Sequence, residues 1–437
     1  MYSGAPRCKK VAIATGRKGK IEKKVPAIIG NPFVDDEFSI QTKNITIIGG
    51  KIKATNTLTG VNKTARFSKY GGDMDERIGN AKGYFTTHKD PQTGIWNIVD
   101  PDGYAFYSAG LNSVKKSSAV NIADSLKGIY INTLGSWSDA FSGMAYTPNL
   151  NLGLNYKNTT ARTKSLYSKR IFPAFDIQFE HFCDSLVAIR ISSAQKTDPF
   201  LLGYFTDNEL TIGSTYTNGP GLPFFLDVAN YGGQALADKD PNYLAAVNWM
   251  KSQHGGVLVT PAPNDVAAWT GVLAERYYQI VCAAVKKHDP NHLILGNRMN
   301  LDLTNPYLMN ASAKYCDILS LNNYHVWTDA EIDTRLDAVE QANIPYIATE
   351  FYARVSDVPL TSAGYAVKTV QDQADFFETY TMAMISHKGN VGYHFFNAKE
   401  LMGTTGTWLN PIQAPGSFRK INRDIYRLRS YLINKHK

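Results

Sequence analysis

Beyond about residue 80, short apolar runs alternate with longer segments in which apolar residues recur every three or four positions. The short runs have the length of buried strands, and the longer segments have the spacing of one buried helix face. The strand-like runs lie at residues 104–110, 129–134, 144–148, 200–205, 292–296, 317–321, 346–349 and 391–396. Eight strands that alternate with helices predict an α/β fold, specifically a closed parallel (β/α)8 TIM barrel.

Two helical segments have clear ends. One carries its apolar series over residues 269–284 and stops at Pro290, just before the fifth predicted strand, and the other runs over residues 376–387 and stops at Gly389. Proline and glycine both favour the end of a helix. The first 79 residues lack this alternation and contain short β-like runs such as residues 45–48. We therefore predict a small β-like extension at residues 1–79 and a catalytic barrel at residues 80–437.

The net charge of +8 is concentrated at the N-terminus. The first 25 residues carry eight lysines and arginines against one acidic residue, Glu22, so the rest of the chain is close to neutral. A basic arm can bind nucleic acid or an anionic polymer, but a solvated tail is the simpler interpretation. We therefore expect no nucleic-acid partner.

Motifs for metals, nucleotides and membranes are missing from the sequence. The cysteines Cys8, Cys183, Cys282 and Cys316 form no CxxC or metal-type spacing, and no GxxxxGK[ST], GxGxxG, HExxH or GxSxG motif occurs. No apolar stretch approaches the length of a membrane span. We expect no cofactor, no metal and no membrane partner, and the oligomeric state stays open. The N-terminus has no apolar signal-peptide segment, which leaves a secreted or periplasmic protein whose signal was removed, or a cytoplasmic one.

Two carboxylates directly follow predicted strands four and seven. Glu209 comes after Asp207-Asn208, and Glu350 comes after Thr349. Barrel active sites form at the carboxyl ends of the strands, so these residues are expected to face each other across the mouth. In a retaining glycosidase one carboxylic acid protonates the leaving oxygen, while a carboxylate about 5 Å away attacks the anomeric carbon. We predict Glu209 as acid/base and Glu350 as nucleophile, and we read Asp207 as a helix cap.

Other strand ends supply candidate sugar contacts. These are Asn112, Ser113, Trp137, Asn208, Asn297, Arg298, Asn322, Asn323, Tyr324, His325 and Arg354. Tyr324 is either a hydrogen-bond donor that keeps Glu350 ionised or a wall residue. Arg298 and Arg354 either bind an anionic substituent or orient a carboxylate. Trp327 and Trp408 either stack on sugars or pack in the core.

Several longer motifs resemble family 50 of the glycoside hydrolases, the β-agarase family. They lie at residues 96–103, 106–112, 132–139, 203–209, 277–298 and 344–351, and the likeness extends over about residues 80–400. The resemblance implies a retaining barrel enzyme that acts on β-linked galactans of red algae. It also implies Glu209 as acid/base, Glu350 as nucleophile and Asn208 as the partner of the sugar 2-hydroxyl.

The sequence departs from the family pattern after the nucleophile and in strand eight. Residues 352–355 stand where the family usually has a His-Phe-Gly type run, and residues 394–397 stand where it usually carries a tryptophan. By the resemblance, these positions, including His394 and Asn397, line the subsite of the cleaved sugar. We therefore expect a galactan hydrolase whose substrate is of the agar, porphyran or carrageenan type. A β-galactosidase acting on small oligosaccharides and a non-catalytic polysaccharide-binding barrel remain the alternatives.

Overall fold

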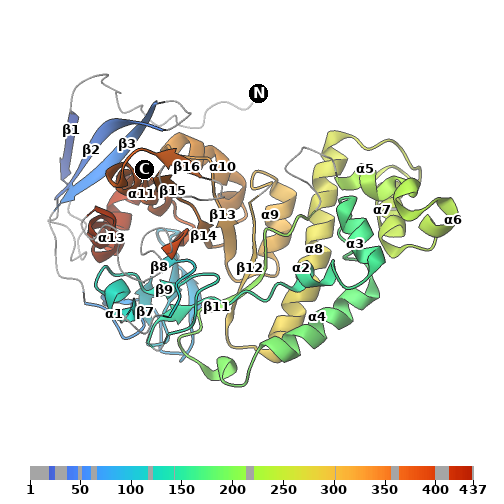
Figure 1. The fold of residues 1–437 in the computed structure, drawn as a ribbon, viewed down its shortest axis with the longest axis horizontal. Helices are drawn as coiled ribbons and strands as arrows, with labels where there is room; N and C mark the ends of the chain where they lie inside the picture. The colour runs from blue at the N-terminus through green and yellow to red at the C-terminus, as the bar shows by residue number, and fades with distance from the viewer. Residues whose placement is uncertain are drawn as a thin grey trace.

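The computed structural model describes ten segments of the chain. They are residues 19–24, 37–47, 52–60, 66–116, 122–141, 143–212, 221–300, 302–355, 364–398 and 413–435. The elements form an α/β arrangement in which a strand-rich part stands beside a mainly helical part (Figure 1). The predicted α/β class is confirmed.

Each of the eight predicted strand runs contains or overlaps a strand that belongs to a parallel pairing. These strands are β8 (Ser108–Leu111), β9 (Thr133–Leu134), β10 (Ala145–Tyr146), β11 (Gly203–Asn208), β12 (Leu293–Arg298), β13 (Leu319–Asn322), β14 (Tyr346–Glu350) and β17 (Asn390–Phe395). Six of them form one parallel sheet in the order β10-β9-β8-β17-β14-β13, and β11 pairs in parallel with β12. The polar carboxyl ends of the strands therefore point the same way within each sheet.

Isolated parallel bridges connect the two sets of strands. Tyr146 pairs with Leu201 and Asn149 with Phe205, which brings β10 next to β11, and Met299 pairs with Leu321, which brings β12 next to β13. These contacts are single bridges and not extended ladders. Within the described residues the sheets are therefore a mixture of parallel and antiparallel ladders without a continuously hydrogen-bonded closed barrel.

A buried apolar cluster lies between these strands. It includes Phe106, Ala145, Leu202, Phe205, Leu293, Leu295, Ile318, Ile347 and Val391, together with Tyr70, Phe85 and Ile98. Most of its members come from, or lie directly beside, strands of both parallel sheets, while Tyr70, Phe85, Ile98 and Phe106 come from the segment that precedes the first parallel strand. A second and larger cluster joins the strands to the helices. This division is typical of side chains that alternate between the inner and outer faces of strands.

An antiparallel sheet precedes the first parallel strand. Its strands are β4 (Asp73–Arg77), β5 (Thr86–Lys89), β6 (Trp96–Val99) and β7 (Tyr104–Phe106), in the order β4-β7-β6-β5. The predicted strand at residues 104–110 is therefore two strands, β7 and β8. They separate at Tyr107, whose backbone N–H donates to the Tyr426 hydroxyl at 2.7 Å instead of to a neighbouring strand. β4 lies before residue 79 and pairs with β7 after it.

The N-terminal strands form a separate antiparallel sheet, β1-β2-β3 (Figure 1). Their bounds are Gly19–Lys24, Glu37–Thr46 and Ile52–Gly60. Ile45 and Ile47 are buried in the larger core cluster, and Lys53 forms an ion pair with Glu331 at 3.0 Å. Burial of these two apolar side chains attaches the sheet to the main body of the chain.

Helices fill most of the connections between the parallel strands. They are α1 (Ile122–Lys127), α2 (Leu152–Tyr156), α3 (Ala161–Ser168), α4 (Ile177–Arg190), α5 (Gly221–Leu226), α6 (Gln234–Ala237), α7 (Pro241–Gln253), α8 (Pro263–His288), α9 (Pro306–Ala313), α10 (Asp329–Gln341), α11 (Val370–Ile385), α13 (Gln413–Arg423) and α14 (Ile425–Lys435). Short 3-10 helices lie at Gln195–Thr197 and Val228–Tyr231, and β15 (Ala353–Val355) pairs in parallel with β16 (Tyr365–Val367). Both predicted helical segments are confirmed, in α8 and α11.

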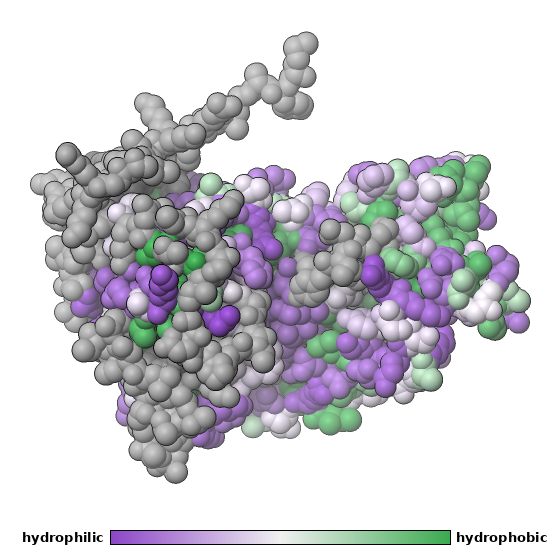
Figure 2. All heavy atoms as spheres, turned by 45° about the horizontal axis from the view of Figure 1, so that its top comes forward, coloured by the Kyte–Doolittle hydropathy of each residue, from purple (hydrophilic) through white to green (hydrophobic). Residues whose placement is uncertain are grey.

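The helical part on the right of Figure 1 is built mainly from the connections that flank β11. α4, α5 and α9 pack against the long helix α8, and α5 also packs against α7. Large apolar side chains are exposed on the connection from β11 to β12, at Leu236, Leu244, Val257, Leu258 and Val259. Figure 2 shows hydrophobic surface at this helical end of the molecule, on the right of the view. Among the helices of the described segments, none combines the length and the apolar character needed to cross a bilayer.

Candidate active site

Left-handed backbone conformations follow four of the parallel strands. Ser113, Trp137, Glu209 and His325 have φ values of +61°, +60°, +50° and +63°, after β8, β9, β11 and β13 respectively. Non-glycine residues adopt such conformations rarely, and they concentrate at functional sites. The chain therefore turns sharply where the candidate site residues leave the strands.

Glu350 is the last residue of β14 and is only 4% exposed. Its Oε1 lies 3.0 Å from Nη2 of Arg298, and its Oε2 accepts a hydrogen bond of 2.5 Å from the Tyr324 hydroxyl. Burial raises the pKa of Glu350, while the Arg298 charge and the Tyr324 hydrogen bond lower it, and the net shift is upward. The predicted contact between Tyr324 and the nucleophile position is thus present.

Arg298, the last residue of β12, is fully buried. Besides Glu350, its guanidinium donates to Oδ1 of Asn208 and to the carbonyl of Thr349, both at 2.8 Å. Burial lowers the pKa of Arg298, and the nearby Glu350 charge opposes this shift. Of the two roles considered for Arg298, the geometry fits orientation of a carboxylate, because the cation is already paired inside the protein.

Glu209 directly follows β11 and is half-buried. Its backbone N–H donates to the carbonyl of Arg298 at 3.1 Å, and its Oε1 accepts from Nδ2 of Asn322 at 2.8 Å. The charge of Glu209 also contributes to the raised pKa of Glu350, so the two carboxyl groups interact electrostatically. Asn322, considered from the sequence as a sugar contact, is 1% exposed and bonded to a carboxylate instead.

Asp207 has a separate role. Its carboxylate accepts the backbone N–H groups of Gly153 and Leu154 at 2.7 and 2.8 Å, at the start of α2, and the Tyr277 hydroxyl at 2.6 Å. Burial raises the pKa of Asp207 to about 6. The helix-cap reading of Asp207 is confirmed, although the helix that it caps lies before β11 in the chain.

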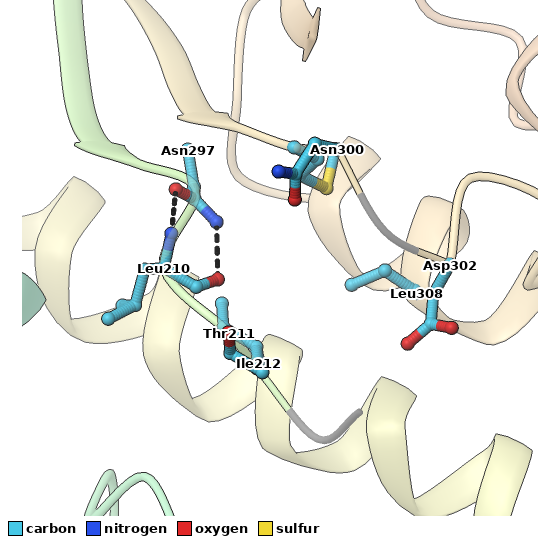
Figure 3. A pocket seen from close by; sticks show the side chains of 8 residues that line it. Leu210, Thr211, Ile212, Asn297, Asn300, Asp302 and Leu308 are labelled. Carbon is cyan, nitrogen blue, oxygen red and sulfur yellow. Dashed lines mark hydrogen bonds between the residues drawn. The ribbon is translucent and has the colours of Figure 1, made fainter. Parts of the chain in front are cut away.

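Several expected sugar contacts are buried against the backbone. Asn112 donates to the carbonyl of Thr349 at 2.9 Å. Asn297 accepts from the N–H of Leu210 at 3.1 Å and donates to its carbonyl at 3.0 Å (Figure 3). The backbone N–H of Asn323 donates to the carbonyl of Glu350 at 2.7 Å. These three asparagines are at most 2% exposed, so they hold the segments that carry Glu209 and Glu350.

The residues of strand eight differ in their surroundings. His394 is fully buried, its Nε2 lies 3.0 Å from the Ser108 hydroxyl, and burial together with Arg298 lowers its pKa to about 3. It is therefore a neutral side chain beneath the site and not a surface contact. Asn397 is 7% exposed and follows the end of β17.

Three expected contacts are more accessible. Trp137 is 41% exposed, and its ring meets the ring of Phe396 edge-on at 5.9 Å. His325 is exposed, and Arg354 is half-buried in β15. Trp327, in contrast, is fully buried, and its ring centroid lies 4.5 Å from that of Phe376. Of the two roles expected for Trp327, the structure therefore shows packing in the core. Trp408 lies outside the described residues.

A small, partly open hollow adjoins the segment that follows Glu209 (Figure 3). It is lined by Leu210, Thr211, Ile212, Asn297, Met299, Asn300, Asp302 and Leu308. The hydrogen bonds between Asn297 and Leu210 form one of its walls. Within the described segments, no group of three or more His, Cys, Asp or Glu side chains has an arrangement that could hold a metal ion.

No family model matches the chain. It is 23% identical to β-agarase B of Vibrio sp. (strain JT0107) over 340 residues, covering 68% of this chain and 35% of the relative. It is 24% identical to β-agarase A of the same organism over 427 residues, covering 87% and 41%. The chain thus spans well under half the length of these two relatives.

Solved structures show the same relationship in the fold. A protein described as BpGH50 superposes with a TM-score of 0.73 at 22% identity, covering 94% of this chain and 99% of that one. A structure described as an exo-β-agarase gives a TM-score of 0.65 at 17% identity, covering 84% and 68%. The agarase AgWH50C gives 0.62 at 19% identity, covering 84% and 67%. The resemblance to the family 50 β-agarases that the motifs indicated is therefore confirmed.

Proposed function

We propose that this chain is a retaining glycoside hydrolase that cleaves β-galactosidic linkages in red-algal galactans. The unequal surroundings of the two carboxyl groups carry the proposal. Glu350 is paired with a buried cation at 3.0 Å and a tyrosine hydroxyl at 2.5 Å, whereas Glu209 accepts from a neutral amide at 2.8 Å. The cation and the hydroxyl stabilise the charge of Glu350 and offset part of the effect of its burial, so we assign the attack to Glu350 and the proton transfer to Glu209.

In the proposed reaction, Glu209 gives its proton to the glycosidic oxygen as the bond to the anomeric carbon breaks. The Glu350 carboxylate attacks that carbon and forms a covalent glycosyl-enzyme. Glu209, now ionised, takes a proton from water, and the water oxygen displaces Glu350. The two displacements return the anomeric carbon to its starting β-configuration. Arg298 and Tyr324 keep Glu350 in place for both steps.

We further propose that the eight parallel strands close into a (β/α)8 barrel with the site at its carboxyl end. The single bridges from β10 to β11 and from β12 to β13 join the two parallel sheets into one ring of neighbours. The buried cluster with members from both sheets is what the interior of such a barrel requires. Both proposed catalytic residues leave their strands at the carboxyl end, as in other barrel enzymes.

The half-buried Asn208 is the proposed contact for the sugar 2-hydroxyl. Its Oδ1 accepts a hydrogen bond from Arg298. Because the amide oxygen is engaged in this way, the Nδ2 group is the one that can donate to a sugar hydroxyl. Among the other expected contacts, Trp137, His325 and Arg354 have the accessibility that a direct role requires. We assign Asn112, Asn297, Asn323 and His394 to support of the site, because their side chains are buried.

The choice of galactan follows from the relatives. Both curated relatives are β-agarases, and agar is therefore the first substrate to test. Porphyran and carrageenans belong in the same panel, since the residues after Glu350 and in strand eight depart from the family pattern.

Product analysis with this panel tests the proposal. We expect release of oligosaccharides whose new reducing ends are β-anomers in NMR spectra taken within the first turnovers. Glu350→Gln should retain less than about 1% of activity, and Glu209→Ala should regain activity with azide when the leaving group is good. Turnover of small β-galactosides only would indicate a β-galactosidase, and binding without products would indicate a non-catalytic barrel.

A further inference from the structure

Asn322 occupies the space between the segments that carry the two carboxylates. It is the last residue of β13, and its side chain is almost completely buried. Its Nδ2 donates to Oε1 of Glu209 at 2.8 Å, and its Oδ1 accepts from the Thr349 hydroxyl at 2.9 Å. Thr349 directly precedes Glu350. One amide group therefore connects the proposed acid/base to the strand of the proposed nucleophile.

Hydrogen bonds at both ends determine how this amide is oriented. The backbone N–H of Asn322 donates to the carbonyl of Met299 at 2.7 Å, which fixes the start of the side chain. The Thr349 hydroxyl holds the amide oxygen, so the amide nitrogen is turned toward Glu209. An ionised carboxylate only accepts hydrogen bonds, and this orientation satisfies it.

We propose that Asn322 is a positioning residue that decides which oxygen of Glu209 carries the catalytic proton. Oε1 is occupied by the amide N–H, so the proton resides on Oε2. In the first step Oε2 gives this proton to the glycosidic oxygen, and in the second step Oε2 takes one from water, while Oε1 keeps its bond to Asn322 throughout. The inference rests on the proposed function, because it assigns a direction to the proton of the same acid/base.

Other charged groups near Glu209 have different partners. Arg298 donates to Asn208 and Thr349 and pairs with Glu350, and the Tyr324 hydroxyl donates to Glu350. All three of Arg298, Tyr324 and Glu350 interact electrostatically with Glu209. The guanidinium of Arg298 and the hydroxyl of Tyr324 contact Glu350. The hydrogen bond from the Asn322 amide is therefore the contact that distinguishes the two oxygens of Glu209.

Removal of the amide should therefore change proton delivery more than binding. For Asn322→Ala we expect kcat to fall about 10- to 100-fold with KM nearly unchanged. The basic limb of the pH–rate profile, where the acid/base loses its proton, should move up by about one pH unit, because a donor to the ionised form is gone. Asn322 also contributes a hydrogen bond that lowers the pKa of Glu350, so the acidic limb should move up too. It should move by less than the basic limb, because Glu350 keeps Arg298 and Tyr324.

Two further variants separate this effect from loss of folding. Asn322→Asp keeps the shape of the side chain but places a second carboxylate against Oε1, so the basic limb should move up further than with alanine. Asn390→Ala removes another buried asparagine, which accepts from Tyr107 at 2.5 Å and donates to Gly392 at 3.1 Å at the start of β17. It should lower the melting temperature without moving either limb. Equal pH profiles for Asn322→Ala and Asn390→Ala would overturn the inference.

A measurement without turnover makes the inference independent of substrate choice. In protein labelled with ¹³C at glutamate carboxyl carbons, the Glu209 signal, assigned with Glu209→Gln, is followed during a pH titration. Its midpoint should rise in Asn322→Ala relative to the wild type, and an unchanged midpoint would refute the role of Asn322 even in an active enzyme. Absence of hydrolysis by the wild type on the whole galactan panel would contradict the proposed function, while the titration would still decide the inference.

Discussion

The guanidinium of Arg298 lies over the indole ring of Trp137, with its carbon 4.5 Å from the ring centroid. The same group contacts Glu350 at 3.0 Å. A buried cation thus joins an exposed aromatic ring to the proposed nucleophile. Such stacking restrains the guanidinium plane and so favours one orientation of the hydrogen bonds that its N–H groups donate.

Arg298→Ala should lower kcat about 100-fold or more on neutral and sulfated galactans alike. The change leaves Glu350 buried without its cation, which raises the pKa of the nucleophile and releases its position. The acidic limb of the pH–rate profile should therefore move to higher pH. Steady-state kinetics on both substrate types check this, and a loss confined to sulfated substrate would contradict the orienting role.

Arg354→Ala should behave differently. Arg354 lies in β15, four residues after Glu350, and is half-buried. If it pairs with a sulfate of the substrate, its loss should raise KM for the sulfated galactan and leave the kinetics on neutral galactan unchanged. Equal falls in kcat on both substrates would show that Arg354 supports a carboxylate instead.

Trp137→Ala should weaken substrate binding by roughly tenfold in KM, about 1.4 kcal/mol. Its ring is accessible and stands beside Arg298, where a sugar face can stack on it. The matched control is Trp327→Ala, because that ring is fully buried against Phe376. The control should lose about 3–5 kcal/mol of unfolding free energy. The prediction fails if Trp137→Ala and Trp327→Ala lose the same unfolding free energy and the KM of Trp137→Ala equals that of the wild type.

Asp207 gives the fold a pH dependence of defined sign. Its folded pKa of about 6 lies above the ordinary value of 3.8, so the folded state binds this proton more tightly than the unfolded state. The contribution is therefore present below about pH 4 and is lost as the pH rises through 6, with a total of about 3 kcal/mol. The difference in unfolding free energy between wild type and Asp207→Asn, measured by urea denaturation, should be more favourable to the wild type at pH 4 than at pH 7. A constant difference would exclude this titration.

The strands were predictable because burial imposes short apolar runs, and all eight runs contain or overlap parallel strands. The division of residues 104–110 into β7 and β8 was not predictable, since it depends on a hydrogen bond from Tyr107 to Tyr426, more than 300 residues later. Single-sequence patterns carry no such long-range information. The antiparallel sheet from β4 to β7 was also missed, although β5, β6 and β7 pair with their neighbours along the chain. Its strands are only three to five residues long, which is too short for a clear alternation of apolar and polar positions.

For the site, the sequence identified the carboxylates, Arg298 and Tyr324 from their places at strand ends. It did not separate residues that can touch a sugar from residues that support the site. Asn297, Asn322 and Asn208 are the same amino acid at the same kind of position, at or next to the end of a strand. Asn297 and Asn322 are distinguished only by their hydrogen-bond partners, Leu210 for Asn297 and Glu209 for Asn322. Partners of this kind are set by side-chain direction, which is not readable from the chain alone.

Main-chain hydrogen bonds hold both proposed catalytic positions. The N–H of Glu209 donates to the carbonyl of Arg298, and the carbonyl of Glu350 accepts from the N–H of Asn323. Any amino acid except proline supplies such an N–H, so these attachments do not depend on the identity of the flanking side chains. Loops beyond the strand ends are therefore free to diverge during evolution while the reacting groups stay in register. New substrate preferences can be selected, or introduced by exchanging loops between homologues, without rebuilding the chemistry.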